Sequence, residues 1–233
     1  ISMEKEKIIV PFEGKKIIAD ILPKGSQPEI LLLHGAGISN RQVFNKLREL
    51  LAEKGIASCA FDFVGYGETG GFVQESSLES RTKQASAVIE ACNLKKPLII
   101  RAGSMAGYNA IKLTELFPVK NLILSAPAVY TKDAYSVNFG EEFSAIIRKP
   151  ESWRASDAWD ILHKFTGDLL IISAEKDTFI PKDVIQMIYD SSVNASSREI
   201  MTIPNAPHQL ATFLQENPKQ FELVIEKVMS VIK

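Results

Sequence analysis

The sequence predicts an α/β fold, in which a mostly parallel β-sheet is covered by helices on both faces. Short apolar runs alternate with segments whose apolar residues recur at helical spacing, the pattern of successive strand–helix units. Residues 29–33 are almost wholly apolar, as expected for a strand buried in the middle of such a sheet. Residues 42–54 follow with helical spacing, and Gly55 is a favourable residue for ending that helix.

The same alternation extends along the chain. Residues 7–12 and 15–22 are expected to pair as an antiparallel hairpin across Glu13-Gly14. The other predicted strands are residues 56–61, 97–102, 121–126, 168–173 and 198–203. The other predicted helices are residues 77–92, 105–117, 182–192 and a last helix from Pro218. Because right-handed crossovers place the strand-to-helix loops on one edge of a sheet, ligands are expected at that edge.

A long segment interrupts this rhythm between the strands 121–126 and 168–173. It spans roughly forty residues, more than an ordinary connection needs, and helical patterns at 141–148 and 156–164 predict short helices within it. We call residues 129–167 the cap segment, an insertion in a single predicted domain of residues 3–233. Its aromatic side chains either pack its own helices or line an apolar substrate pocket. The candidates for the pocket wall are Phe139, Phe143, Trp153 and Trp159.

Composition excludes several classes of function. The chain has 233 residues, 45% of them hydrophobic and 24% charged, with a formal net charge of −1, so no basic surface for nucleic acid is expected. No apolar run is long enough to cross a bilayer and no leader is evident, which predicts a soluble, cytoplasmic protein. The two cysteines, Cys59 and Cys92, are too few for a disulfide framework or a metal cluster. No metal and no organic cofactor are expected.

The strongest chemical signal is Ala102-Gly103-Ser104-Met105-Ala106-Gly107, placed between a predicted strand and a predicted helix. A serine in such a sharp turn projects its hydroxyl above the sheet, and the turn requires small neighbours, because the helix packs back on its strand. Ala102, Ala106 and Gly107 meet that requirement, although the common G-x-S-x-G pattern has glycine where Ala102 and Ala106 stand. Ser104 is therefore the candidate nucleophile.

A second motif, His34-Gly35-Ala36-Gly37, ends an earlier strand. Acyl transfer develops negative charge on the substrate oxygen, which pre-positioned backbone N–H groups stabilise. We expect one donor from Met105 and the other from Ala36, with Gly37 as the alternative for the second. Gly35 and Gly37 allow the substrate to approach the backbone closely, whereas His34 is expected to be structural.

An acid and a base complete the set. Asp177 follows the strand 168–173 and can orient a histidine, with Glu175 as the alternative acid. His208 follows the last predicted strand, and its imidazole suits general acid–base work near neutral pH. The order Ser104, Asp177, His208 along the chain is the order found in α/β-hydrolases.

With these motifs in place, the sequence resembles the α/β-hydrolase superfamily over nearly its whole length. Residues Asp62 to Thr69 are similar to the family's D-x-x-G-x-G-x-[ST] loop. The resemblance implies an eight-stranded sheet with an antiparallel edge and a small helical cap after the sixth strand. A serine nucleophile argues against dehalogenases, epoxide hydrolases and dienelactone hydrolases, which use aspartate or cysteine. The short chain is most similar to bacterial carboxylesterases and to acylglycerol-lipase-like or cinnamoyl-esterase-like enzymes.

The resemblance implies hydrolysis of a small-molecule carboxylic ester through an acyl-enzyme on Ser104. An amidase or peptidase on the same residues is the first alternative. A hydrolase-like binding protein without turnover is the second, and a lyase or acyltransferase is a weaker third.

Overall fold

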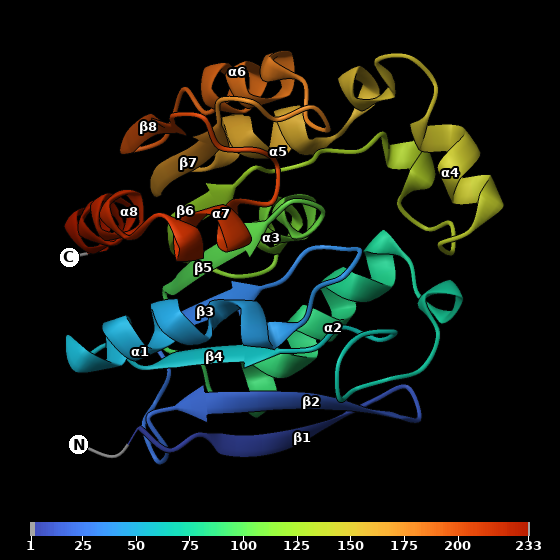
Figure 1. Ribbon diagram of the computed structural model, residues 1–233. Helices are drawn as coiled ribbons and strands as arrows, with labels where there is room; N and C mark the ends of the chain where they lie inside the picture. Colours follow the sequence, from blue (N-terminus) through green and yellow to red (C-terminus); the bar gives the residue numbers. More distant parts are fainter. Residues whose placement is uncertain (1–2, 233) are drawn as a thin grey trace.

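The computed structural model describes residues 3–232 as an eight-stranded sheet between two layers of helices (Figure 1). The strand order is β1-β2-β4-β3-β5-β6-β7-β8. Strand β2 pairs antiparallel with both β1 and β4, and the other neighbours pair in parallel. Ile1, Ser2 and Lys233, the last residue of the predicted domain, lie outside the described residues. The α/β-hydrolase fold class predicted from the sequence is confirmed.

The strands follow the apolar runs closely. Their bounds are β1 Glu6–Phe12, β2 Lys15–Leu22, β3 Ile30–Leu33, β4 Ser58–Phe61, β5 Leu98–Gly103, β6 Val119–Ser125, β7 Asp168–Ala174 and β8 Ser197–Ile203. All four residues of β3 and all four of β4 are buried, as expected for strands covered on both faces.

The helices form one layer on each face of the sheet. One face carries α2 (Leu78–Ala91), α3 (Ala106–Leu113), α5 (Ala158–Lys164) and α6 (Lys182–Ser191). The other carries α1 (Asn45–Glu53), α7 (Leu210–Glu216) and α8 (Pro218–Val231) (Figure 1). Each layer buries its own apolar core against the sheet, so strand side chains alternate between the two cores.

Helix boundaries differ from the sequence prediction at several places. The predicted helix 105–117 corresponds to α3, which begins at Ala106 and ends at Leu113. The predicted helix 42–54 begins as a 3₁₀ turn, Arg41–Phe44, before α1, and its cap is Asn40, whose side chain accepts from the Gln42 N–H. Helix α7 was not predicted, since its seven residues are too few for a clear helical period. It follows the His208 loop directly, and its first residues line a cavity that also contains Ser104 and His208.

The cap segment forms short helices, as predicted. Two further 3₁₀ turns, Lys132–Ala134 and Ser152–Ala155, accompany α4 (Glu141–Ile147) and α5, and another, Val73–Glu75, precedes α2. Helix α4 stands apart from the two layers at one end of the sheet (Figure 1). No helix in residues 3–232 has the length and apolarity needed to span a membrane.

Candidate active site

Ser104 lies in a strained turn between β5 and α3. Its φ of 47° is in the left-handed region, which a non-glycine residue adopts only when its surroundings enforce it. The Ser104 N–H donates to the Ser125 carbonyl at 3.0 Å, and the Ser104 carbonyl accepts from the Ala128 N–H at 3.0 Å. Gly107, at the start of α3, packs closely against the residues after β6, because a Cβ at position 107 would lie 2.8 Å from the Pro127 Cβ. The end of β6 and the residues after it therefore fix the serine.

The structure brings Ser104, His208 and Asp177 together from three separate loops. The Ser104 Oγ lies 2.9 Å from the His208 Nε2, and the His208 Nδ1 lies 2.8 Å from the Asp177 Oδ2. Because an ionised carboxylate only accepts, the hydrogen-bond network assigns the proton to Nδ1 and leaves Nε2 to accept from the serine hydroxyl. This is the arrangement that a general base requires.

Asp177 is itself held in place. Its Oδ1 accepts from the Phe179 N–H at 2.8 Å and from the Ile180 N–H at 2.9 Å, which leaves Oδ2 directed at the histidine. The alternative acid, Glu175, has a different position, since its Oε2 accepts from the Asn205 N–H at 2.6 Å. Glu175 thus anchors the loop that carries His208, and Asp177 is the carboxylate that contacts the imidazole.

Two backbone N–H groups beside Ser104 are free. Within residues 3–232, neither the Met105 N–H nor the Ala36 N–H donates to a protein acceptor. Gly35 lets the Ala36 loop approach the nucleophile, because a Cβ at position 35 would lie 3.2 Å from the Ser104 Cβ and 3.3 Å from the Gly103 carbonyl oxygen. Unpaired donors next to a serine are what a developing oxyanion requires.

His34 holds this loop and is buried. Its Nε2 accepts from the Phe63 N–H at 3.1 Å, so its Nδ1 carries the proton and donates to the Gly35 carbonyl at 2.7 Å. Burial, reinforced by the positive charge of Arg81, lowers the pKa of His34 to about 3. The ring is therefore neutral at physiological pH, and it ties the loop after β3 to the loop after β4.

Gly35→Ala tests how tightly this loop fits the nucleophile. The added methyl meets the Ser104 Cβ and backbone, neither of which can move cheaply, so the serine or the Ala36 N–H shifts by some tenths of an ångström. We expect kcat for turnover at Ser104 to fall about tenfold or more, with a smaller change in KM. Steady-state kinetics alongside thermal unfolding checks this, and an unchanged kcat in a folded variant would contradict the proposed fit.

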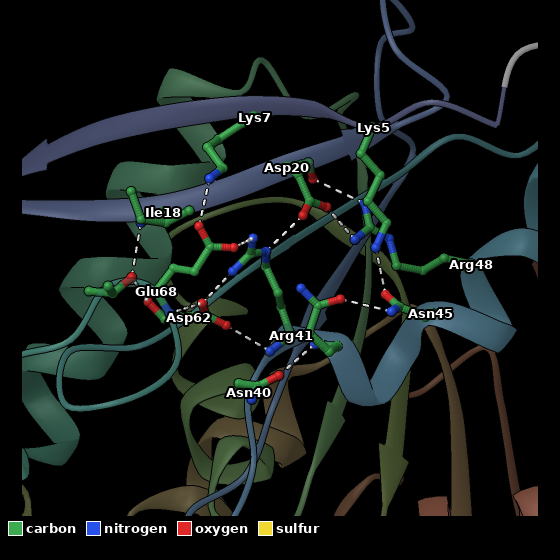
Figure 2. A network of polar contacts seen from close by, with 12 residues as sticks. Lys5, Lys7, Ile18, Asp20, Asn40, Arg41, Asn45, Arg48, Asp62 and Glu68 are labelled. Atoms are coloured by element: carbon green, nitrogen blue, oxygen red, sulfur yellow. Dashed lines mark hydrogen bonds and ion pairs between the residues drawn. The ribbon is translucent and has the colours of Figure 1, made fainter.

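A network of mostly buried ion pairs lies next to the loop that carries Ala36 (Figure 2). Asp20 lies between Arg41 and Arg48, and Arg41 also pairs with Asp62 and with Glu68. Arg41 directly follows the Ala36 loop, and its own N–H donates to the Asp62 Oδ1 at 2.8 Å. The network therefore connects the loop that carries Ala36 to β2 and to the loop after β4.

Asp62 also organises its own loop. Its Oδ2 accepts from the Glu68 N–H at 2.9 Å, and its carbonyl accepts from the Thr69 hydroxyl at 2.7 Å. Gly67, with a φ of 50°, leaves room for the carboxylate, because a Cβ there would lie 2.3 Å from the Asp62 Oδ2. These contacts give the physical reason for the D-x-x-G-x-G-x-T pattern.

Two acids of the network, Asp20 and Glu68, are ionised at neutral pH. Burial by itself would raise the pKa of Asp20, but the charges and hydrogen bonds of Arg48 and Arg41 outweigh it and hold that pKa below its ordinary value. Hydrogen bonds from Lys7 and Arg41 lower the pKa of Glu68 to about 2. Because the folded-state pKa of Asp20 is depressed, its stabilisation is complete above the unfolded-state pKa and is lost as the pH falls through the lower folded value.

Two cavities adjoin Ser104 and His208. The first, of about 180 Å³, lies under α7 and is bounded by the Ala36 loop and the ends of β5 and β6; we call it the α7 cavity. The second, of about 310 Å³, lies under the cap segment, and its wall includes Tyr130, Ile147 and Trp153; we call it the cap cavity. A substrate with groups on both sides of a scissile bond can place one in each.

The predicted pocket residues divide between the cavities and the cap's own packing. Gly35 and Ala36 line the α7 cavity, and Trp153 lines the cap cavity. Phe139, Phe143, Trp159 and Gly37, also predicted to contact substrate, do not line either of these two cavities. Phe139 and Phe143 are buried edge-to-face at 4.9 Å, and the Trp159 indole N–H donates to the Trp153 and Arg154 carbonyls. Helices this short bury their aromatics to become stable.

Most residues that line the two cavities were not predicted from the sequence, and two cases matter for the chemistry. One is residues 209–212 at the start of α7, whose helix gave no signal. The other is Arg101, which lines the α7 cavity from within β5. A single charge inside the apolar strand Leu98–Gly103 was the available signal for it.

Comparisons with known proteins agree with this fold. A family model described as serine aminopeptidase, S33, matches residues 25–153. A solved esterase of Pyrococcus furiosus has a TM-score of 0.73 at 18% identity, over 99% of this chain and 94% of that one. An esterase of Exiguobacterium antarcticum has a TM-score of 0.72 at 21% identity, over 95% and 98%. Est1E of Butyrivibrio proteoclasticus, solved with ferulic acid bound, has a TM-score of 0.67 at 19% identity, over 94% and 99%.

Among curated protein sequences there is no significant match. The structural likenesses, at these identities, establish the fold. The family model covers more than half of the chain, and the chain therefore belongs to the serine aminopeptidase S33 family of α/β-hydrolases.

Proposed function

We propose that this hydrolase cleaves carboxylic esters through an acyl-enzyme on Ser104. The observation that carries the proposal is the continuous hydrogen-bonded chain from Ser104 through His208 to Asp177, placed where two cavities meet beside two free N–H groups. Such an arrangement positions a nucleophile, its base and the donors for an oxyanion before substrate arrives.

The proposed reaction has two steps. Ser104 Oγ attacks the acyl carbon while His208 Nε2 takes its proton, and Asp177 stabilises the resulting imidazolium. The Met105 and Ala36 N–H groups donate to the oxyanion, and His208 then protonates the departing alcohol. In the second step a water molecule, deprotonated by the same histidine, attacks the acyl-enzyme and releases the acid.

The family's description makes an aminopeptidase the competing function. Such an enzyme must recognise a free α-ammonium group, and a buried or half-buried carboxylate is the natural partner for that charge. Within residues 3–232, no aspartate or glutamate lines either cavity, and the α7 cavity contains the cation Arg101. This charge pattern disfavours an ammonium substrate and supports an ester substrate.

A matched ester and amide pair tests the proposal. We expect 4-nitrophenyl acetate and butyrate to be hydrolysed, with an acyl-enzyme detected on Ser104 by intact mass and peptide mapping after rapid acid quench. The corresponding 4-nitroanilides and aminoacyl-4-nitroanilides are expected to be far slower. Faster cleavage of the aminoacyl anilides would favour the peptidase, and no turnover or acylation of either would favour a binding protein.

A further inference from the structure

Arg101 occupies an unusual place in the sheet, three residues before the nucleophile. It lies on the same face of β5 as Ile99, the face covered by α1, α7 and α8, and it lines the α7 cavity together with Ser104 and His208. The residue is only 8% exposed. A guanidinium is thus fixed in the wall of a cavity that opens onto the reacting serine.

The charge of Arg101 has no partner in the described residues. It makes no side-chain hydrogen bond or ion pair, its Nε is buried without an acceptor, and its nearest compensation is the Phe44 ring, 5.3 Å from the guanidinium carbon. The other buried arginines each make side-chain hydrogen bonds. Arg41 and Arg48 pair with carboxylates, and Arg81 donates to the His34 carbonyl and to Asn109, although its Nη1 has no acceptor in the described residues.

An unpaired buried charge is costly to the fold. Burial lowers the pKa of Arg101 to about 10, so the side chain remains protonated at neutral pH. A hydrophobic residue would suit the surrounding apolar core of Leu47, Leu214 and Val224 better than an arginine does. A bound ligand that carries a negative charge would offset the cost of burying this guanidinium.

The rest of the α7 cavity fits an anionic group. No acidic residue lines it, and the hydroxyl groups of Ser39, Ser125 and Thr212 can donate from its wall. None of these hydroxyls makes a hydrogen bond within the described residues. The cap cavity, in contrast, is lined by Val129, Trp153, Ile180 and other mostly apolar residues and contains no arginine or lysine.

We propose that the α7 cavity binds a carboxylate carried by the substrate and that Arg101 is its specificity-determining residue. The inference rests on the proposed ester hydrolysis and narrows it to esters that bear a free carboxylate, with the apolar remainder in the cap cavity. A guanidinium can bind both carboxylate oxygens in parallel, which a lysine cannot do.

The test uses two series of paired esters. The first contains 4-nitrophenyl monoesters of glutaric, adipic and pimelic acids, with the carboxylate on the acyl side. The second contains acetate esters of ω-hydroxy acids, with the carboxylate on the alcohol side. Each acid is paired with its neutral methyl ester, and the readout is the ratio of kcat/KM for the acid to kcat/KM for the methyl ester.

In the wild type we expect this ratio to exceed 1 for at least one chain length. Arg101→Met is expected to lower it by about 30-fold or more, the scale of a lost charge-assisted bidentate contact, and Arg101→Lys by an intermediate factor. Lys46→Met is the control for loss of a nearby positive charge, since Lys46 lies on α1 and lines a neighbouring cavity with Arg101 but does not line the α7 cavity, and it should leave the ratio unchanged.

Equal ratios in wild type and Arg101→Met across both series would overturn the inference while leaving ester hydrolysis intact. If no ester is hydrolysed at all, the proposed function fails, and the carboxylate site is then tested by a binding measurement. Isothermal titration of adipate into wild type and Arg101→Met would then show weaker binding in the variant. Absent binding, or equal affinity in the two proteins, would contradict a carboxylate site.

Discussion

Replacing Ser104 with alanine is expected to lower kcat for ester hydrolysis by about 10⁵-fold or more. The change removes the only atom that can form the acyl-enzyme while leaving the strained turn and both free N–H groups in place. His208→Ala should cost a similar factor, and the double variant should lose little beyond either single one, because nucleophile and base act as a unit. Asp177→Asn should lower kcat by about 10⁴-fold, since the imidazole would then adopt the wrong tautomer.

Two substitutions elsewhere serve as controls for this series. His163→Ala removes an exposed histidine on α5, and Ser86→Ala removes a hydroxyl on α2 that bonds only to the Thr82 carbonyl. Both should retain wild-type kcat. Thermal unfolding of every variant separates loss of chemistry from loss of fold. A Ser104→Ala protein that keeps more than a hundredth of the wild-type rate would exclude Ser104 as nucleophile.

The largest expected effect on stability comes from Asp62→Ala. The substitution removes the acceptor of Arg41 Nη1 and of the Arg41 N–H, both buried, and of the partly buried Glu68 N–H, while Arg41 keeps its contacts with Asp20 and Glu68. Removing one partner of a buried ion pair typically costs 3–5 kcal/mol of unfolding free energy. For a chain of this length we expect the unfolding temperature to fall by about 10 °C.

The exposed pair of Lys24 and Glu4 provides the comparison. The two side chains are 54% and 63% exposed, so Lys24→Met should change the unfolding free energy by less than about 1 kcal/mol. Differential scanning calorimetry of both variants measures the contrast. Since the ion network also supports the Ala36 loop, Asp62→Ala should lower kcat in the protein that remains folded. A stability loss no larger than that of Lys24→Met would show that the network is dispensable.

Local sequence patterns predicted most of the sheet because each strand is a short apolar run bounded by turn residues. The positions of Ser104, Asp177 and His208 followed from strand ends, and the structure places all three in contact. The same reasoning missed α7, whose seven residues lack a helical period. The sequence left open whether the cap aromatics pack the cap or line a pocket, because composition does not show which way a ring points, and Phe139 and Phe143 are buried.

The long-range charges were equally hidden from local reasoning. Nothing in the sequence alone pairs Asp20 with Arg41 and Arg48, which lie 21 and 28 residues away. They meet because α1 and the turn before it pack over the neighbouring strands β2 and β4. Arg101, in contrast, has no acidic partner in the described residues, which only the full set of contacts shows. Ion pairing depends on topology, which periodicity does not report.

Covalent labelling by a fluorophosphonate probe tests the central claim most directly. The reagent phosphonylates only a serine whose hydroxyl is activated by a positioned base, so it reports the assembled site without assuming a substrate. We expect intact mass to show one adduct per chain and peptide mapping to place it on Ser104, with none in Ser104→Ala and strongly slowed labelling in His208→Ala. Folded wild-type protein that remains unlabelled, or that is labelled at another serine, would contradict the account.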